Sequence, residues 1–266
     1  MTILDRRSAA DGPATPARAG ERLFARYAFA PNELGYCGPA ESAALFELGV
    51  TGHSDADVTD IARRFSGAWP YLVLLAEQAG IADPLDARVV RAYWTGSRLL
   101  DQLDRQRFGS RLIEFIGSRA GYYWHHLTPE LLSEASPTHG FHVFGVYPWS
   151  RLLGRETEQP LRVLDSCRIR WGQVVSVQDE HVIVRSRRLT WDGCRLGLGR
   201  PGEERVRLNL AGRGFVPDPA PGQWLALHWD WVCDRITDTD RIELVRWTDW
   251  QLRATNARFA LERQAR

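Results

Sequence analysis

The chain contains no lysine: all 34 of its basic residues are arginine. A functional demand would not remove lysine from every surface position, so this absence indicates the codon bias of a GC-rich, bacterial genome. Charge of one sign is also lacking, because 33 acidic residues leave a formal net charge of only +1. A nearly neutral chain has no strong field to attract nucleic acid or anionic lipid.

Long apolar runs and paired cysteines are missing as well. The first residues carry charges where a secretory signal needs an apolar core, and no later segment reaches the length of a membrane span. The four cysteines form no C-x-x-C pair, which argues against a zinc ribbon or a thioredoxin-type site. They are Cys37, Cys167, Cys194 and Cys233. We expect free thiols in a reducing compartment, and hence a cytoplasmic protein.

The length of 266 residues allows two domains of mixed α+β class. Residues 1–20, rich in Ala, Pro, Gly and charge, predict a disordered leader. Residues 21–160 repeat apolar positions every three or four residues over most of their length, which predicts a mainly helical domain of unknown role. Residues 161–266 are predicted to form a small OB-like β-barrel and a C-terminal helix.

Short β-rich segments separated by Gly, Pro and Asp fill the second half of the chain. The predicted strands lie within 141–149, 160–169, 173–186, 205–210 and 223–232. The helical period returns after Asp238 and predicts one long terminal helix.

Cys167 and His228 are the two residues of this half best suited to bind a metal. A thiolate is both a soft metal ligand and a nucleophile. The positive charges of the neighbouring Arg168 and Arg170 are expected to stabilise the thiolate form of Cys167. His228 supplies a nitrogen ligand or an acid–base group if the barrel brings its first and last strands together. On residue type alone, a buried cysteine and a hydrogen-bonded strand histidine are the simpler interpretation.

Residues 167 to about 250 resemble the HypC/HupF family of nickel–iron hydrogenase assembly chaperones. That family begins with a cysteine, places Pro-Gly four and five residues later, and continues with V-x-x-V. The matching residues here are Cys167, Gly172, Val174 and Val177. A later family motif that ends in a histidine is matched by Gly222, Trp224, Leu225, Leu227 and His228. Two differences stand out: the cysteine is internal here, and Trp171 replaces the family's proline.

The resemblance implies an accessory maturation chaperone that helps deliver or hold an iron centre with cyanide and carbonyl ligands. The implied partners are the hydrogenase large-subunit precursor and an iron-centre assembly scaffold protein. No permanently bound cofactor, no catalytic residue and no membrane contact is implied. Cys167, Gly172 and His228 would contact the partner or the iron centre, with Cys167 and His228 as metal ligands.

A second constellation, Cys37, His142 and Asp165, predicts a cysteine enzyme instead. Cys37 precedes a helical pattern, where amide groups and the helix dipole lower a thiol pKa. His142 begins one predicted strand and Asp165 ends the next. This order is that of papain-like and transglutaminase-like enzymes, in which the acid orients the histidine base. Asn32 is the candidate oxyanion-hole donor, but the glutamine that normally precedes such a cysteine is absent.

Two further alternatives are weaker. OB-like barrels bind single-stranded nucleic acid through a basic groove with stacking aromatics, and 185–191 offers arginines beside a tryptophan, but the net charge argues against it. His125 and His126 form a possible ligand cluster with His139 and His142. Because adjacent helical histidines face different sides, a packed aromatic patch is the favoured interpretation of that cluster.

Overall fold

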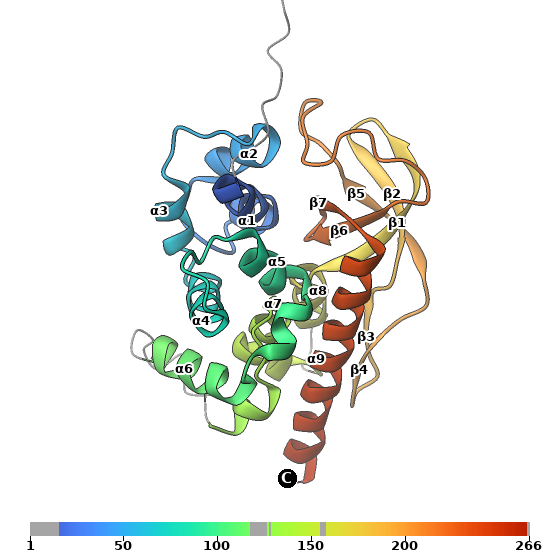
Figure 1. The fold of residues 1–266 in the computed structure, drawn as a ribbon. Helices are drawn as coiled ribbons and strands as arrows, with labels where there is room; N and C mark the ends of the chain where they lie inside the picture. The colour runs from blue at the N-terminus through green and yellow to red at the C-terminus, as the bar shows by residue number, and fades with distance from the viewer. Residues whose placement is uncertain (1–15, 118–126, 128, 155–157, 265–266) are drawn as a thin grey trace, which may run out of the picture.

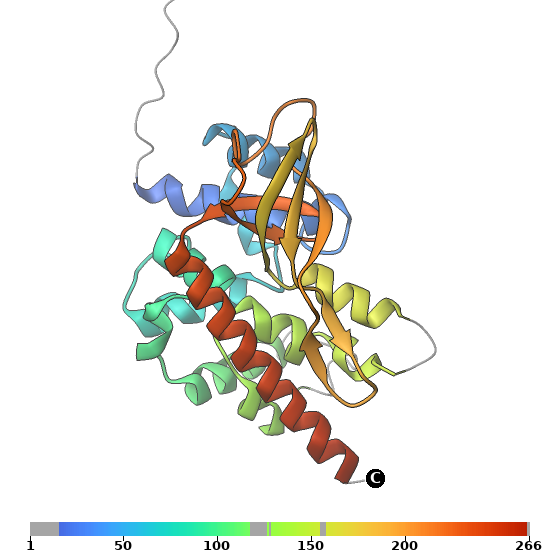
Figure 2. The ribbon, with the colours of Figure 1, turned by 90° about the vertical axis from the view of Figure 1, so that its right-hand side faces the viewer.

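The computed structural model describes residues 16–117, 127, 129–154 and 158–264, and its class is mixed α+β. The helices of the first half lie on one side and a five-stranded sheet lies on the other, and the terminal helix α9 (Asp238–Gln264) starts beside the sheet and runs away from it along the helices (Figures 1 and 2). The expected order of helices, strands and terminal helix is therefore confirmed at this level. No described helix is both long and apolar enough to cross a membrane.

Helix α1 (Pro16–Glu33) begins inside the segment predicted as a leader, of which residues 1–15 lie outside the described residues. Gly20 explains this difference, because a Cβ atom there would lie 1.7 Å from the carbonyl oxygen of Leu85. Glycine at this position therefore allows α1 to pack closely against the chain at Leu85. The other helical elements before the sheet are α2 (Ser42–Thr51), α3 (Val58–Arg63), α4 (Trp69–Ala79), α5 (Ala87–Thr95), η1 (Arg98–Gln102), α6 (Arg105–Gly117), η3 (Pro129–Glu134), α7 (His139–Phe141), η4 (His142–Val146), η5 (Pro148–Leu152) and α8 (Gln159–Cys167).

Two segments predicted as strands, 141–149 and 160–169, are mainly helical, so that prediction was wrong. The run from Phe141 to Val146 is buried on every side, and periodicity cannot then distinguish a strand from a helix. In α8, Pro160 occupies the first turn, where proline is well tolerated in a helix. Val163 and Leu164 follow at helical spacing and are buried, so the apolar side of α8 faces the core.

The main sheet closes on itself with the strand order β1-β2-β5-β7-β6, and β6 pairs back onto β1. All pairs are antiparallel except β5 with β7, which are parallel at Arg207 and Trp231. Valine and leucine side chains that alternate along the strands fill its interior. The five strands are β1 (Arg170–Gln178), β2 (His181–Ser186), β5 (Gly202–Arg207), β6 (Trp224–His228) and β7 (Trp231–Ile236). A separate hairpin is formed by β3 (Leu189–Trp191) and β4 (Leu196–Leu198).

The helical half and the sheet share one core. Phe29 of α1 packs edge-on against Trp231 of β7, with ring centroids 5.0 Å apart. Arg26 of α1 forms an ion pair of 3.0 Å with Asp234 of β7. Helix α8 also crosses the boundary predicted between residues 160 and 161. The junction between the halves is therefore a packed interface, and the candidate site lies within it.

Candidate metal centre

A cavity of about 50 Å³ lies at this junction. Its walls come from α1, α5, α7, η4, α8 and the end of β6, and they include aromatic side chains such as Tyr93 and Trp94. Among the described lining residues none is acidic and none is arginine. The thiol and imidazole side chains that line this apolar cavity are those of Cys37, His139, His142, Cys167 and His228.

Cys167, His139 and His228 lie close together in this cavity. Cys167 is the last residue of α8, His139 the first of α7, and His228 the last of β6. One potential ligand atom from each lies within 4.8 Å of the other two. Cys167 Sγ is 3.9 Å from His139 Nε2. The structure thus places the two predicted metal ligands beside each other and adds a histidine from the helical half.

Strand pairing explains why Cys167 and His228 meet. The first residue of β1, Arg170, is the register partner of Leu227 in β6. Cys167 comes shortly before Arg170, and His228 comes directly after Leu227. The amide of Trp229 also donates a hydrogen bond of 2.7 Å to the carbonyl of Ser166, which fixes the two chain segments side by side.

His228 is fully buried and has one nitrogen without a hydrogen bond. Its Nδ1 lies 2.7 Å from the carbonyl oxygen of Tyr27. A carbonyl only accepts, so Nδ1 carries the proton and Nε2 keeps its lone pair. Nε2 has no hydrogen-bond partner among the residues that the structure describes. An unpaired buried acceptor is costly, and a bound cation would satisfy it.

Burial sets the protonation of the site. It lowers the pKa of His228 to about 4 and that of His142 to about 3, and it lowers the pKa of His139 well below its ordinary value. All three imidazoles are therefore neutral at pH 7, the form that binds metal. Burial also raises the pKa of the Cys167 thiol, so the thiol keeps its proton until a cation displaces it.

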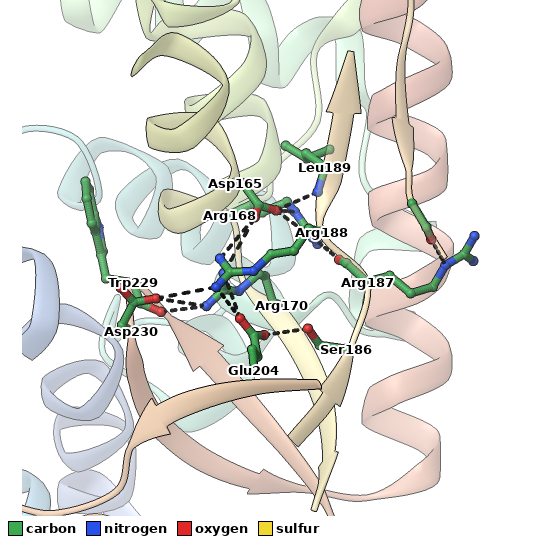
Figure 3. Close-up of polar contacts among 11 residues, drawn as sticks. Asp165, Arg168, Arg170, Ser186, Arg187, Arg188, Leu189, Glu204, Trp229 and Asp230 are labelled. Carbon is green, nitrogen blue, oxygen red and sulfur yellow. Dashed lines mark hydrogen bonds and ion pairs between the residues drawn. The ribbon is translucent and has the colours of Figure 1, made fainter. Parts of the chain in front are cut away.

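The prediction that Arg168 and Arg170 stabilise the Cys167 thiolate was wrong. Both guanidinium groups point to a carboxylate: Arg168 Nη2 lies 2.9 Å from Asp165 Oδ1, and Arg170 Nη1 lies 3.6 Å from Asp165 Oδ2. They form a charge network with Arg188, Glu204 and Asp230 at the junction of α8 with the barrel (Figure 3). Arg170 also donates a hydrogen bond of 2.9 Å to the carbonyl of Trp229, the residue after His228. The network therefore holds the backbone around the site.

The structure does not bring Asp165 to His142, as the cysteine-enzyme constellation requires. Asp165 instead accepts hydrogen bonds from Arg168, Arg188 and the amide of Leu189. His142 Nδ1 has no hydrogen-bond partner among the described residues. Cys37 and His142 do line the same cavity. The acid of this constellation is nevertheless occupied elsewhere.

Cys37 is not activated in the expected way. The nearest following helix, α2, begins only at Ser42, so Cys37 lies outside its first turn. Burial raises the pKa of Cys37 to about 11, the reverse of the expected shift. The amide group of Asn32 donates to the carbonyls of Cys37 and Pro39, so it is not available as an oxyanion-hole donor.

Gly172 lies in β1 and does not line the cavity. A Cβ atom at this position would lie 2.8 Å from Val184, so glycine is required by packing inside the barrel. The implied contact with a partner or an iron centre is therefore unsupported at this residue.

The remaining predicted features lie away from the cavity or are engaged. Arg185 pairs with Glu203, and Arg187 donates to the carbonyls of Leu198 and Gly199, so neither offers a free basic groove. His125 and His126 lie outside the described residues. All four cysteines are free, as expected.

His139 was not predicted to lie near Cys167 and His228. The sequence suggested it only as part of a cluster with His125, His126 and His142. Its approach to Cys167 depends on the packing of α7 against α5, where the Tyr93 hydroxyl and His139 Nδ1 share a hydrogen bond of 3.0 Å. No local sequence pattern encodes that long-range contact.

Comparison with known proteins places the chain in a family without assigning a function. No curated protein and no solved structure matches it. Residues 16–262, which span both the helical half and the barrel, match the family of unknown function DUF6390, and the chain therefore belongs to that family.

Proposed function

We propose that the protein is an accessory maturation chaperone for a nickel–iron hydrogenase, and that Cys167 and His228 hold the iron centre during its transfer. The observation that carries this proposal is the proximity of the Cys167 thiol to a fully buried nitrogen of His228 that has no hydrogen-bond partner in the described part of the chain. These are the two residues that the resemblance to the HypC/HupF chaperones singles out.

The sheet topology supports the same proposal. Numbered along the chain, the closed sheet runs first, second, third, fifth, fourth and back to the first, with its one parallel pair between the third and fifth strands. This is the arrangement of a five-stranded Greek-key barrel of the OB type. We therefore propose an OB-like barrel that carries the cysteine just before its first strand and the histidine at the end of its fourth.

The chemistry of the cavity suits an iron centre with small ligands as cargo. A thiolate and neutral imidazoles are good donors for transition metals. A cavity of about 50 Å³ has room for about three or four water-sized groups, at roughly 10–15 Å³ each, so small side-chain movements would be needed to hold an ion with several diatomic ligands. One thiolate neutralises only half of a divalent charge, so an apolar cavity favours a metal that brings anionic ligands such as cyanide.

The competing functions receive less support. A cysteine enzyme needs an activated thiol and an oriented base, whereas burial raises the pKa of Cys37 to about 11 and Asp165 pairs with arginines. A single-strand-binding barrel needs a free basic groove, and the arginines of 185–188 that were predicted to form it are bonded to carboxylates and carbonyls.

The proposal is tested in a bacterial strain that lacks the native gene and depends on it for hydrogenase activity. Plasmids encode the wild type, Cys167→Ala, His228→Ala and the control Cys194→Ala, which removes an exposed thiol away from the cavity. We expect the two site variants to abolish maturation and the control to restore it. Normal maturation with Cys167→Ala, at equal protein abundance, would overturn the proposal.

A further inference from the structure

We infer that His139 is a third metal ligand, so that the helical half completes a Cys-His₂ site and leaves the remaining coordination positions open to small exogenous ligands. This inference rests on the proposed metal-binding role of Cys167 and His228. It assigns the helical half a direct part in binding a divalent transition-metal ion.

Geometry is the first argument. His139 Nε2 lies 3.9 Å from Cys167 Sγ, and the ligand atoms of His139, Cys167 and His228 all lie within 4.8 Å of one another. Donor atoms of one tetrahedral site, at about 2.0–2.3 Å from the ion, lie roughly 3.3–3.8 Å apart. Small side-chain movements therefore suffice to bring the three donors onto one ion.

The hydrogen bonds around His139 permit the required tautomer. The Tyr93 hydroxyl lies 3.0 Å from His139 Nδ1 and donates a bond of 3.4 Å to the carbonyl of Gly67. With that orientation it accepts the Nδ1 proton and leaves Nε2 unprotonated. Without metal, Nε2 carries the proton and donates it to the carbonyl of Cys167, 2.9 Å away, because a carbonyl only accepts. A bound ion selects the first arrangement, in which the ring is held by Tyr93 as metal-binding histidines normally are.

Both histidines are thus oriented by the helical half. Tyr27 of α1 fixes His228 through its carbonyl, and Tyr93 of α5 fixes His139 through its hydroxyl. His142 lines the same cavity but does not belong to the group of three ligand atoms. This difference between two buried histidines of one segment makes the inference specific.

Three protein ligands leave one position open on a four-coordinate ion such as Zn²⁺ or Co²⁺ and three on a six-coordinate iron, each available to a small exogenous ligand. Binding displaces the Cys167 proton to solvent and leaves one positive charge on a divalent ion with one thiolate and two neutral imidazoles. Because no described lining residue is acidic, an exogenous anion must neutralise that charge. Such a site both holds a metal and exposes it to an incoming ligand.

Co²⁺ titration of the purified full-length protein tests the inference. We expect one equivalent to give a thiolate-to-cobalt charge-transfer band in the near ultraviolet and intense tetrahedral visible bands, which shift when azide is added. His139→Gln should weaken Co²⁺ affinity by more than the about 10–100-fold typical of losing an outer-shell partner. Tyr93→Phe should fall within that range, since it removes only the partner of Nδ1.

His142→Gln is the matched control, because it changes a buried histidine of the same cavity and should leave the cobalt spectrum unchanged. Circular dichroism and thermal unfolding of each variant show that it folds. Unchanged affinity in folded His139→Gln, or a loss confined to His142→Gln, would overturn the inference while the proposed function stands. If the wild type binds no Co²⁺ through Cys167, the proposed metal role of Cys167 and His228 fails with it.

Discussion

The buried imidazole of His228, at the end of β6, donates its Nδ1 proton to the carbonyl of Tyr27 in helix α1 over 2.7 Å. This contact is one of several that join the barrel to the helical half, and it leaves Nε2 as an acceptor with no partner among the residues that the structure describes. Burial outweighs this hydrogen bond and lowers the pKa of His228 to about 4, so the imidazole is neutral at pH 7 and keeps a lone pair on Nε2. The predictions below follow from that arrangement and from the contacts that enclose it.

Acidification should destabilise the protein through its buried histidines. The folded-state pKa of His142 is about 3 and that of His228 about 4, both below the ordinary 6.5. Between pH 6.5 and those values the unfolded chain binds protons that the folded chain refuses, so the free energy of unfolding falls as pH falls. At a cost of about 1.4 kcal/mol per pH unit below 6.5, we expect a loss of about 3 kcal/mol from each histidine by pH 4.5.

Urea unfolding at several values between pH 7.5 and 4.5 measures this slope. His142→Gln should make the slope shallower, since it removes one of the groups responsible. His53→Gln, at an exposed position, should leave the slope as in the wild type. Identical slopes in all three proteins would contradict the assignment of acid sensitivity to the cavity.

Tyr36 and Trp229 close one side of the cavity. Their rings stack with centroids 4.1 Å apart, and both line the cavity and the larger surface cavity of about 1130 Å³ beside it. An aromatic stack contributes about 0.5–1.5 kcal/mol, so Tyr36→Ala should increase the fraction of molecules in which the cavity is open to solvent about two- to tenfold. We expect Cys167 to react with a thiol reagent faster by that factor.

Peptide mapping after timed alkylation at one fixed pH measures the rate at each cysteine. Cys194 is exposed and serves as an internal reference whose rate should not change. Leu34→Ala is the matched control, because Leu34 is exposed on the same segment but forms no part of the cavity wall. Equal acceleration by Leu34→Ala would show that general loosening, and not loss of the stack, exposes the thiol.

The charge network around Arg170 should be a major source of stability. Arg170 is fully buried and faces Asp165, Glu204 and Asp230 (Figure 3). Arg170→Met leaves buried carboxylates short of a partner, which typically costs about 3–5 kcal/mol. Arg185→Met breaks an exposed pair with Glu203 and should cost at most about 1 kcal/mol. Denaturant unfolding of both variants checks this difference, and equal costs would contradict it.

Sequence patterns predicted the barrel only in part. Strands β2 and β6 lie within predicted segments, and β1 and β5 overlap them. The prediction of one strand over 223–232 was wrong, because a turn at Trp229 and Asp230 divides it into β6 and the start of β7. Helix α8 was not predicted because valine and leucine also occur in strands, and because a helix of nine residues is too short to show a clear helical period. The hairpin of β3 and β4 lies between two predicted strand segments, and its strands of three residues each are too short to show alternation.

The site was predictable only in part. The proximity of Cys167 and His228 follows from barrel closure, because β1 pairs with β6. The pKa of the Cys167 thiol was not predictable from its arginine neighbours, because their side chains point toward Asp165 and Glu204 in the folded chain. His139 reaches the site through tertiary packing of α7 against α5, which leaves no spacing signal in the sequence.

X-ray absorption spectroscopy of the zinc-loaded protein at one equivalent tests the central claim most directly, because it counts the atoms bound to the ion. The account predicts one sulfur at about 2.3 Å and two imidazole nitrogens at about 2.0 Å, with one light fourth ligand. The sulfur shell should vanish in Cys167→Ser and persist in Cys37→Ser. A first shell without sulfur, or one that keeps its sulfur in Cys167→Ser, would contradict it.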